Sequence, residues 1–225
     1  MNLGVFLAIG ESFTDLANKG QLKRLINYNI RAYSQAFDKV CIFSYANEKN
    51  FLLPKNCYLI PNTSGLHRYL YSIILPIIKR EEIVSCDVLR GLQLSGGIPA
   101  SIAKIIYAKK FVINYGYDYS KFAKIESKSL QSFLYKLIEI PIIKLADAVI
   151  VTARDIKRKL AKKIKQSKTF YIPNGVDTKL FRPLPQKPNK NFSVIYLGRL
   201  EKQKNLENLL IALADFKNIR ITLFG

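Results

Sequence analysis

The chain has 225 residues, 49% of them hydrophobic, and its 36 Lys and Arg outnumber its 16 Asp and Glu, which gives a formal net charge of +20. This hydrophobic content supplies a packed core and excludes a wholly disordered chain. The charge favours an anionic partner, namely a nucleic acid, an anionic membrane face or a phosphorylated substrate, although lysines that only cover solvent-facing surfaces would give the same excess.

Cysteine usage and the N-terminus predict the compartment. Cys41, Cys57 and Cys86 lie in apolar, strand-like runs without metal-ligand spacing, which predicts buried thiols in a reducing environment. The N-terminus, MNLGVFLAIGESF, has no basic segment and a short apolar stretch, so it predicts a first strand and not a signal peptide. No run approaches the roughly 18 apolar residues of a membrane span. We therefore expect a cytoplasmic protein.

Strand-like and helix-like patterns alternate along the chain, which predicts an α/β fold with a doubly wound parallel sheet. Apolar runs predict strands at 3–9, 39–44, 57–60, 83–89, 111–114, 148–151, 169–172, 192–197 and 219–224. Helical spacing predicts helices at 22–30, 66–78, 99–108, 130–138, 155–168 and 205–216, and polar or aromatic runs predict loops at 10–20, 92–99 and 115–119. Pro76 and Pro141 are expected to kink or end their helices, and Pro99 to open its own.

A proline-rich connector divides the chain. We predict a first domain over 1–172, a hinge and linker over 173–191 that contains Pro183, Pro185 and Pro188, and the beginning of a second α/β domain over 192–225. The strand, helix and strand predicted after the linker cannot bury a core of their own, so we expect a domain that is cut short.

The run Gly198-Arg199-Leu200-Glu201-Lys202-Gln203-Lys204 lies between a predicted strand and a predicted helix. Ligands of open α/β sheets bind at the carboxyl ends of strands, and a helix N-terminus attracts phosphate. Arg199 supplies a bidentate fork for phosphate oxygens and Lys204 a point charge, while Gly198 lets the backbone approach closely. A solvated basic turn has the same spacing, so the motif alone leaves both interpretations open.

Three segments carry a family resemblance: IPNGVDTKLFRP at 172–183, IYLGRLEKQKNLENLLIAL at 195–213 and, more weakly, ADAVIVTARDIKRKL at 146–160. They resemble the retaining nucleotide-sugar glycosyltransferases of family 4, also called group 1. These enzymes have the GT-B fold, in which two Rossmann-like domains face each other across a cleft. The resemblance implies that Arg199 and Lys204 bind the diphosphate of the donor and that the turn at 174–177 is a hinge.

The chain departs from the family pattern in its first domain. The family's glycine pair in the first βα loop is replaced by Lys19-Gly20-Gln21, so only Gly20 carries over as a candidate for the substrate cleft. A histidine that often follows the fifth strand is absent, and Tyr117 and Asp118 lie there as further cleft candidates, unless the tyrosine only packs. The one histidine, His67, is predicted to be a surface or packing residue.

The resemblance also implies that the family's Glu-x7-Glu motif and its nucleotide-recognising loops lie beyond Gly225. We therefore expect the 225-residue chain to be inactive alone and its complete parent to be active.

The segment 155–168 predicts a basic surface helix whose apolar stripe consists of Ile156, Leu160 and Ile164. Lys and Arg near an anionic membrane contribute about 1 kcal/mol each, and the resemblance to enzymes that extend lipid-linked glycans supports peripheral attachment to the inner membrane face. A solvated basic face is the alternative. The candidate membrane contacts are Lys157, Arg158, Lys159, Lys162 and Lys163.

The leading hypothesis is an enzyme of the hexosyltransferase type, which moves a sugar from a nucleotide-sugar to a glycan or lipid-linked acceptor during cell-envelope or surface polysaccharide synthesis. The resemblance implies that no cofactor or metal is required, and the sequence contains no Asp-x-Asp cluster that would hold a metal. One alternative is a non-catalytic acceptor domain or subunit that needs a separate donor-domain chain. A nucleic-acid-binding protein is less favoured, because no RNP, KH, zinc or helix-turn-helix signature occurs.

Overall fold

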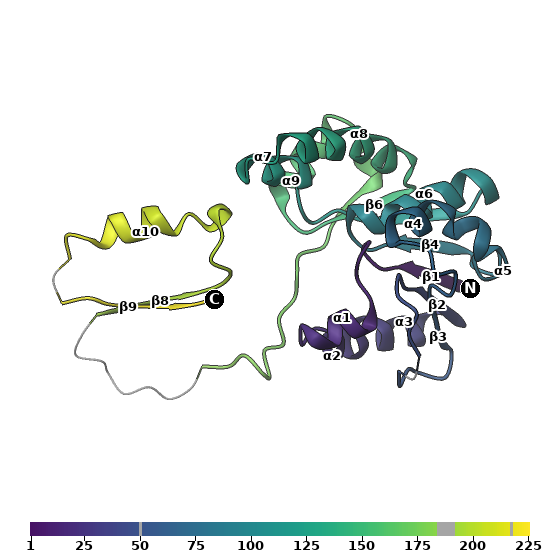
Figure 1. The fold of residues 1–225 in the computed structure, drawn as a ribbon, viewed down its shortest axis with the longest axis horizontal. Coiled ribbons are helices and arrows are strands. Elements are labelled where there is room, and N and C mark those ends of the chain that lie inside the picture. The colour runs from purple at the N-terminus through teal and green to yellow at the C-terminus, as the bar shows by residue number, and fades with distance from the viewer. Residues whose placement is uncertain (50, 184–191, 217) are drawn as a thin grey trace. The chain divides into compact units, whose positions relative to one another are not determined.

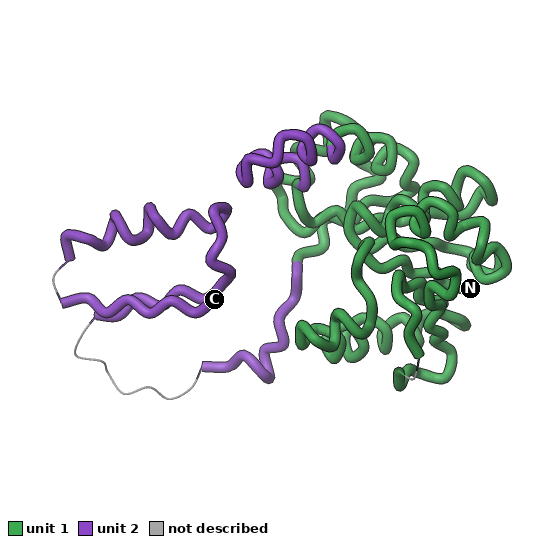
Figure 2. The backbone as a smooth tube through the Cα atoms, viewed as in Figure 1, with its two compact units in different colours: residues 1–118, 136–173 green, residues 119–135, 174–225 purple. Residues whose placement is uncertain are grey.

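The computed structural model describes residues 1–49, 51–183, 192–216 and 218–225. The chain forms two compact units: unit 1 contains Met1–Asp118 and Lys136–Pro173, and unit 2 contains Tyr119–Tyr135 and Asn174–Gly225 (Figure 2). Unit 1 resembles the predicted first domain in extent, apart from the segment 119–135. Of the predicted linker prolines, Pro185 and Pro188 lie outside the described residues.

Unit 1 is built on a sheet of seven strands in the order β3-β2-β1-β4-β5-β6-β7, with all neighbouring pairs parallel. This confirms the predicted doubly wound α/β fold. The strands are β1 (Asn2–Phe6), β2 (Lys39–Phe43), β3 (Cys57–Ile60), β4 (Val88–Gly91), β5 (Lys110–Asn114), β6 (Ala148–Val151) and β7 (Thr169–Tyr171).

Helical segments connect the strands and cover both faces of the sheet. In Figure 1, α4 and α6 lie on one face and α1, α2 and α3 on the other. The helical segments up to β5 are α1 (Phe13–Asn18), α2 (Leu22–Arg24), the π-helix η1 (Leu25–Ile30), α3 (Arg31–Ala36), α4 (Arg68–Ile78), α5 (Arg80–Val84) and α6 (Gln93–Tyr107). Those that follow β5 are α7 (Tyr119–Ile125), α8 (Ser129–Leu145), α9 (Arg154–Ala161) and the 3-10 turn η2 (Gln166–Lys168).

The core lies along the central strands. In β1 and β2 every residue after the first is buried, as expected of parallel strands that are covered on both faces. Cys41, Cys57 and Cys86 are free and buried, which confirms the predicted buried thiols.

The predicted loop at 10–20 is wrong, because it contains α1. Ser12 caps this helix by accepting the N–H of Asp15 at 2.9 Å. The carboxylate of Glu48, which is 7% exposed, accepts the N–H groups of Phe13 at 3.0 Å and Thr14 at 2.9 Å. Two capping partners, one of them distant in sequence, satisfy the first-turn donors and stabilise a helix of only six residues.

The predicted loop at 92–99 is also wrong, because α6 begins at Gln93 and contains Pro99 in its interior. The small residues that suggested a loop instead let this helix approach the sheet. A Cβ atom added at Gly96 would lie 2.7 Å from the carbonyl oxygen of Phe6, and one added at Gly91 would lie 2.8 Å from the Cα of Gly97. Only glycine therefore fits this contact between β1, β4 and α6.

Other predicted boundaries shift. The apolar run at 83–89 belongs to two elements, since Ile83 lies in α5 and the strand β4 begins only at Val88. Helix α4 ends two residues after Pro76, whereas α8 continues through Pro141 to Leu145. The predicted basic helix at 155–168 ends at Ala161.

Unit 2 contains a βαβ segment, as predicted. The strands β8 (Ser193–Leu197) and β9 (Arg220–Phe224) are parallel, and the 3-10 turn η3 (Lys202–Lys204) and the helix α10 (Leu206–Leu213) connect them. Across the described parts of both units, no helix is long and apolar enough to cross a membrane.

The glycine contact makes a stability prediction. The Gly96→Ala substitution places a methyl group against backbone oxygens that cannot rotate away, so we expect the free energy of unfolding to fall by about 2–3 kcal/mol. Gly175→Ala is the control, because nothing lies within 4 Å of its Cβ position. Urea unfolding of both variants measures the difference, and equal stabilities would contradict the close contact.

Candidate functional site

The sheet of unit 1 reverses its strand order between β1 and β4. Ligands of open α/β sheets bind beyond the carboxyl ends of the strands at such a switch point. A pocket of about 130 Å³ lies there, with Leu7 from the end of β1 and Leu92 from the end of β4 in its wall. The strand order and the pocket therefore indicate the same position for a ligand-binding site.

The lining of this switch-point pocket is mixed. Its apolar part consists of four leucines: Leu7, Leu16, Leu25 and Leu92. Its polar part offers a carboxyl group, a guanidinium group and three amides: Glu11, Arg24, Gln21, Asn29 and Gln93. Such a set of donors and acceptors is suited to hydrogen bonds with the hydroxyl groups of a polyol.

Two unusual backbone segments contribute to the wall. Leu25 and Asn29 lie on the π-helix η1, a kind of segment that occurs often at functional sites. Gln93 is the first residue of α6 and has a φ of +59°, in the left-handed region. The hydroxyl of Ser95, also near the start of α6, accepts the N–H of Ile9 at 3.0 Å and ties this end of the helix to the chain after β1. The positive end of the α6 dipole therefore lies at the pocket.

Glu11 is the acidic group of the pocket. Burial raises the pKa of its carboxyl group, against the opposing attraction of Lys19. A carboxylate with a raised pKa is a better proton acceptor for a substrate hydroxyl than an exposed one. Glu11, Arg24 and Gln93 were not predicted from the sequence, because strand order decides which loops meet here.

The predicted cleft residue Gly20 caps a helix. It has a φ of +67°, its N–H binds the carbonyl of Ala17 at 2.9 Å, and the next N–H, of Gln21, binds the carbonyl of Leu16 at 2.7 Å. This pair of bonds is a Schellman motif at the end of α1. Gln21, the next residue, does line the pocket.

The other predicted cleft residues, Tyr117 and Asp118, follow β5 and do not line the switch-point pocket. Asp118 is 8% exposed and forms an ion pair with Lys159 of α9. Tyr117 is half-buried. His67 is exposed at the beginning of α4, with its ring centre 5.3 Å from that of Tyr69.

The basic residues of α9 and its C-terminal flank divide into two groups. Lys159 pairs with the buried Asp118, and Lys163 lies 3.9 Å from a carboxylate oxygen of the buried Glu139. The remaining candidates for membrane contact, Lys157, Arg158 and Lys162, are exposed. The stripe of Ile156, Leu160 and Ile164 faces inward as predicted, with Leu160 fully buried.

The predicted anion-binding turn lies in unit 2. The N–H of Gly198 donates to the carbonyl of Phe224 at 2.9 Å, and the hydroxyl of Tyr196 donates to the carbonyl of Arg199 at 2.7 Å. These bonds fix the turn after β8. The guanidinium of Arg199 lies 2.8 Å from the carboxylate of Glu201, and Lys204 is exposed at the end of η3.

No protein-family model matches the chain, and no curated protein matches it in sequence. Solved structures do match in fold. Sucrose-phosphate synthase from Thermosynechococcus elongatus has a TM-score of 0.72 at 17% identity, over 100% of this chain and 62% of that chain. The chain has a GT-B-type fold.

Two further solved structures match the chain in fold. The apo form of the lipopolysaccharide outer core galactosyltransferase WaaB has a TM-score of 0.63 at 15% identity, over 99% of this chain and 60% of that chain. Anabaena HepE in complex with UDP and glucose has a TM-score of 0.57 at 14% identity, over 100% of this chain and 69% of that chain. The chain thus spans about 60% of the length of the first two structures, and identities this low show the fold alone.

Among the residues that the structure describes, no group of three or more His, Cys, Asp or Glu side chains could hold a metal ion.

The raised pKa of Glu11 predicts a pH-dependent stability. The folded chain keeps this proton to higher pH than the unfolded chain, so stability falls as the pH rises above the ordinary value of 4.5 and through the folded-state pKa. Glu11→Gln removes the buried charge. We expect it to match wild type in urea unfolding at about pH 3.5 and to exceed it at pH 7. The exposed Glu81→Gln is the control, and an equal gain there would contradict the assignment.

The capping role of Gly20 makes a separate prediction. Gly20→Ala forces a Cβ into the left-handed region and should lower the free energy of unfolding by about 1 kcal/mol. Gly20→Asn should lose less, because asparagine tolerates this conformation. Thermal or urea unfolding measures both, and identical losses would argue against a backbone cause.

Proposed function

We propose that the protein is a glycosyltransferase, which moves a sugar from a nucleotide-sugar donor to a hydroxyl group of a glycan or lipid-linked acceptor. The observation that carries this proposal is the polar pocket at the switch point of a GT-B-type sheet. A carboxyl group, a guanidinium group and amides converge there beside apolar side chains, as in sites that bind small polar molecules.

Unit 1 supplies the acceptor side in this proposal. Glu11 orients the attacking hydroxyl, while Arg24 and the amide of Gln93 bind neighbouring hydroxyl groups. A volume of about 130 Å³ admits part of one sugar ring, so the rest of the acceptor extends outward.

Unit 2 supplies the donor side. The turn from Gly198 to Lys204 presents a guanidinium and an ammonium group to the diphosphate that leaves during transfer, and such preorganised charges stabilise a transition state. The solved complexes of HepE with UDP and with UDP-glucose give a precedent for this ligand class on the same fold. We also propose that the transfer retains the configuration of the sugar and needs no metal ion. Arg199 and Lys204 would neutralise the negative charge of the diphosphate in place of a metal.

Glu201 modulates the donor site. Its carboxylate pairs with Arg199 at 2.8 Å, and the Arg199 side chain is 67% exposed. An exposed ion pair contributes at most about 1 kcal/mol, so a diphosphate with two charge-assisted hydrogen bonds displaces it readily.

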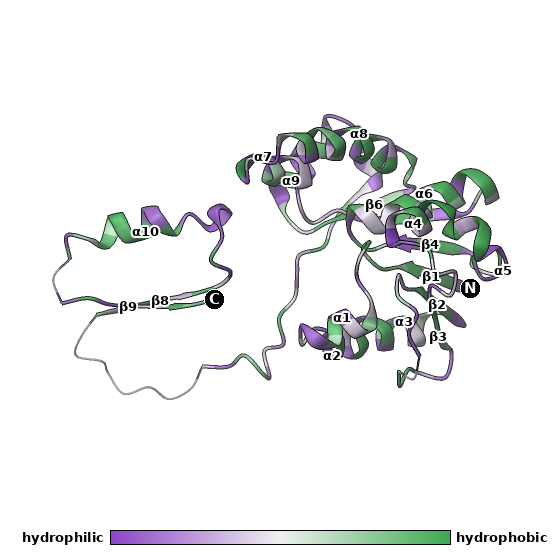
Figure 3. Cartoon of the chain, in the orientation of Figure 1, coloured by the Kyte–Doolittle hydropathy of each residue, from purple (hydrophilic) through white to green (hydrophobic). Residues whose placement is uncertain are grey.

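The surface of unit 1 supports peripheral attachment to an anionic membrane face and a role in envelope or surface polysaccharide synthesis. Figure 3 shows α4 as strongly hydrophobic, and its Leu70, Ile73 and Ile77 are 50%, 54% and 63% exposed. Lys79 and Arg80 follow directly. An exposed apolar face with adjacent cations is typical of interfacial helices.

A second candidate function is an acceptor-domain subunit that works with a separate donor-domain chain. The observation that favours it is the exposure of Ile195 and Leu197 on β8, at 67% and 83%. Exposed apolar side chains on a sheet indicate a surface for another polypeptide segment. Purification of the protein expressed from its natural gene tests this: transfer activity that appears only with a second polypeptide would select the subunit.

The donor site is tested by substitution in the protein expressed from its natural gene. Arg199→Ala should lower kcat/KM for the nucleotide-sugar by about a hundredfold, since it removes a charge that acts on the leaving group. Arg199→Lys should lower kcat/KM by a smaller factor, because it keeps the positive charge. Glu201→Gln should tighten UDP binding by about twofold to fivefold, because it frees the guanidinium.

Arg220→Ala is the matched control for these variants, because Arg220 lies in the same unit at the start of β9 and outside the turn. An equal loss in Arg199→Ala and Arg220→Ala would contradict the donor site. A loss of transfer in Glu11→Gln with unchanged UDP binding would assign Glu11 to the acceptor side.

A further inference from the structure

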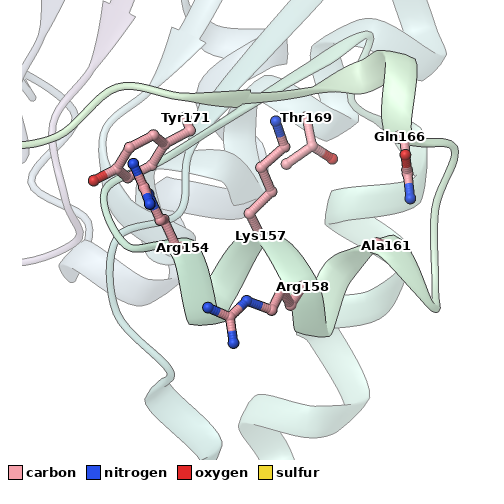
Figure 4. Close-up of a pocket in the computed structure, with 7 residues that line it drawn as sticks. All are labelled: Arg154, Lys157, Arg158, Ala161, Gln166, Thr169 and Tyr171. Carbon is pink, nitrogen blue, oxygen red and sulfur yellow. The ribbon is translucent and has the colours of Figure 1, made fainter.

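A second and larger pocket of unit 1 has no role in the proposed transfer. It has a volume of about 360 Å³, within the range of small-molecule sites, and lies between α9 and the edge strand β7 (Figure 4). We call it the edge pocket. Its polar and aromatic lining consists of Arg154, Lys157, Arg158, Gln166, Thr169 and Tyr171.

Three of these side chains are cations from one face of α9. Arg154, Lys157 and Arg158 are spaced at i, i+3 and i+4, so they lie on the same side of the helix. None of the described residues that line the pocket is acidic. Arg158 has one exposed ion pair, at 3.5 Å to Asp155, and Arg154 lies over the ring of Tyr171 at 5.7 Å. Lys157 has no carboxylate partner among the described residues.

Thr169 gives a second and independent indication. It is 5% exposed, and its hydroxyl oxygen has no hydrogen-bond partner among the described residues. In Figure 4 its side chain points from β7 toward α9, into the same space that the side chain of Lys157 enters from the helix. Buried hydroxyl groups in folded proteins are nearly always paired, so this hydroxyl beside a cation is a candidate donor to an oxygen-bearing ligand.

We propose that the edge pocket binds a phosphate group carried on a small polar body such as a glycerol or a sugar. The hydroxyl of Thr169 donates a hydrogen bond to one phosphate oxygen, and Lys157 and Arg154 neutralise its charge. The ring of Tyr171 and the amide of Gln166 contact the body that carries the phosphate. A volume of about 360 Å³ accommodates such a body, whereas phosphate alone would leave most of the pocket empty.

The same chemistry has two sources, namely a phospholipid headgroup and a soluble phosphorylated metabolite. A solvated basic helix face would also attract phosphate, but it would not depend on a buried hydroxyl group. The effect of removing the Thr169 hydroxyl therefore distinguishes a specific phosphate site from unspecific electrostatic attraction.

The first experiment titrates the protein with inorganic phosphate and with glycerol 3-phosphate and follows the backbone amides of Thr169 and Ala161 by NMR. We expect saturable shifts and tighter binding of glycerol 3-phosphate. Lys157→Gln should weaken binding about tenfold, through a lost charge-assisted hydrogen bond, and Thr169→Val about fivefold. Thr169→Val keeps the shape of a β-branched strand residue and removes a hydroxyl that has no protein partner, so the fold is expected to persist.

Lys165→Gln is the matched control, because it removes one charge from the same basic segment without lining the pocket. It should leave binding unchanged. Equal weakening in Lys165→Gln and Lys157→Gln, or no effect of Thr169→Val, would overturn the proposal, as would unsaturable shifts.

The second experiment separates the sources. Flotation with vesicles of phosphatidylcholine, with and without phosphatidic acid, is compared for wild type and Thr169→Val. Association that requires phosphatidic acid and falls in Thr169→Val assigns the pocket to a lipid headgroup. Saturable binding of glycerol 3-phosphate without Thr169-dependent flotation assigns it to a soluble ligand. Absence of both rejects a phosphate site.

Discussion

The contact between glycines of β4 and α6 and the backbone of β1 is the constraint on which unit 1 depends. Gly91, Gly96 and Gly97 bring the helix so close to the sheet that any side chain would meet backbone or packed side-chain atoms within 3 Å. This approach places the start of α6 at the strand-order reversal and Gln93 in the wall of the switch-point pocket. Fold and site thus depend on the same short stretch.

Much of the fold could be predicted from the sequence, because parallel strands buried on both faces leave continuous apolar runs. Helix α1 and the first turn of α6 could not be predicted from the sequence. Their residues are small or polar, and groups distant in sequence stabilise them as helices. Glu48, more than thirty residues from Phe13 and Thr14, accepts the first-turn N–H groups of α1. The backbone of β1, more than eighty residues from Gly96, packs against the first turn of α6. Tertiary contacts override local preference at such positions.

The candidate site residues also divide into some that the sequence predicted and others that it did not. The turn at Gly198–Lys204 is contiguous, so its spacing after a strand was legible in the sequence. The switch-point pocket combines Glu11, Arg24 and Gln93 from separate segments, and only the strand order brings them together. The excess of positive charge is likewise divided by structure, since Lys159 and Lys163 neutralise buried carboxylates while Lys157 has no such partner among the described residues.

Glu48 has a consequence for binding at the switch point. Its two oxygens accept the N–H groups of Phe13 and Thr14 and the hydroxyl of Thr14, so three bonds fasten α1 to the segment after β2. The hydroxyl of Ser44 donates a fourth bond to the same carboxylate from within that segment. Leu16, within this helix, and Gln21, just beyond its end, line the pocket. That wall is already ordered before a ligand arrives, and little conformational entropy remains to be lost on binding. A buried carboxylate remote from the pocket thereby acts as its preorganising element.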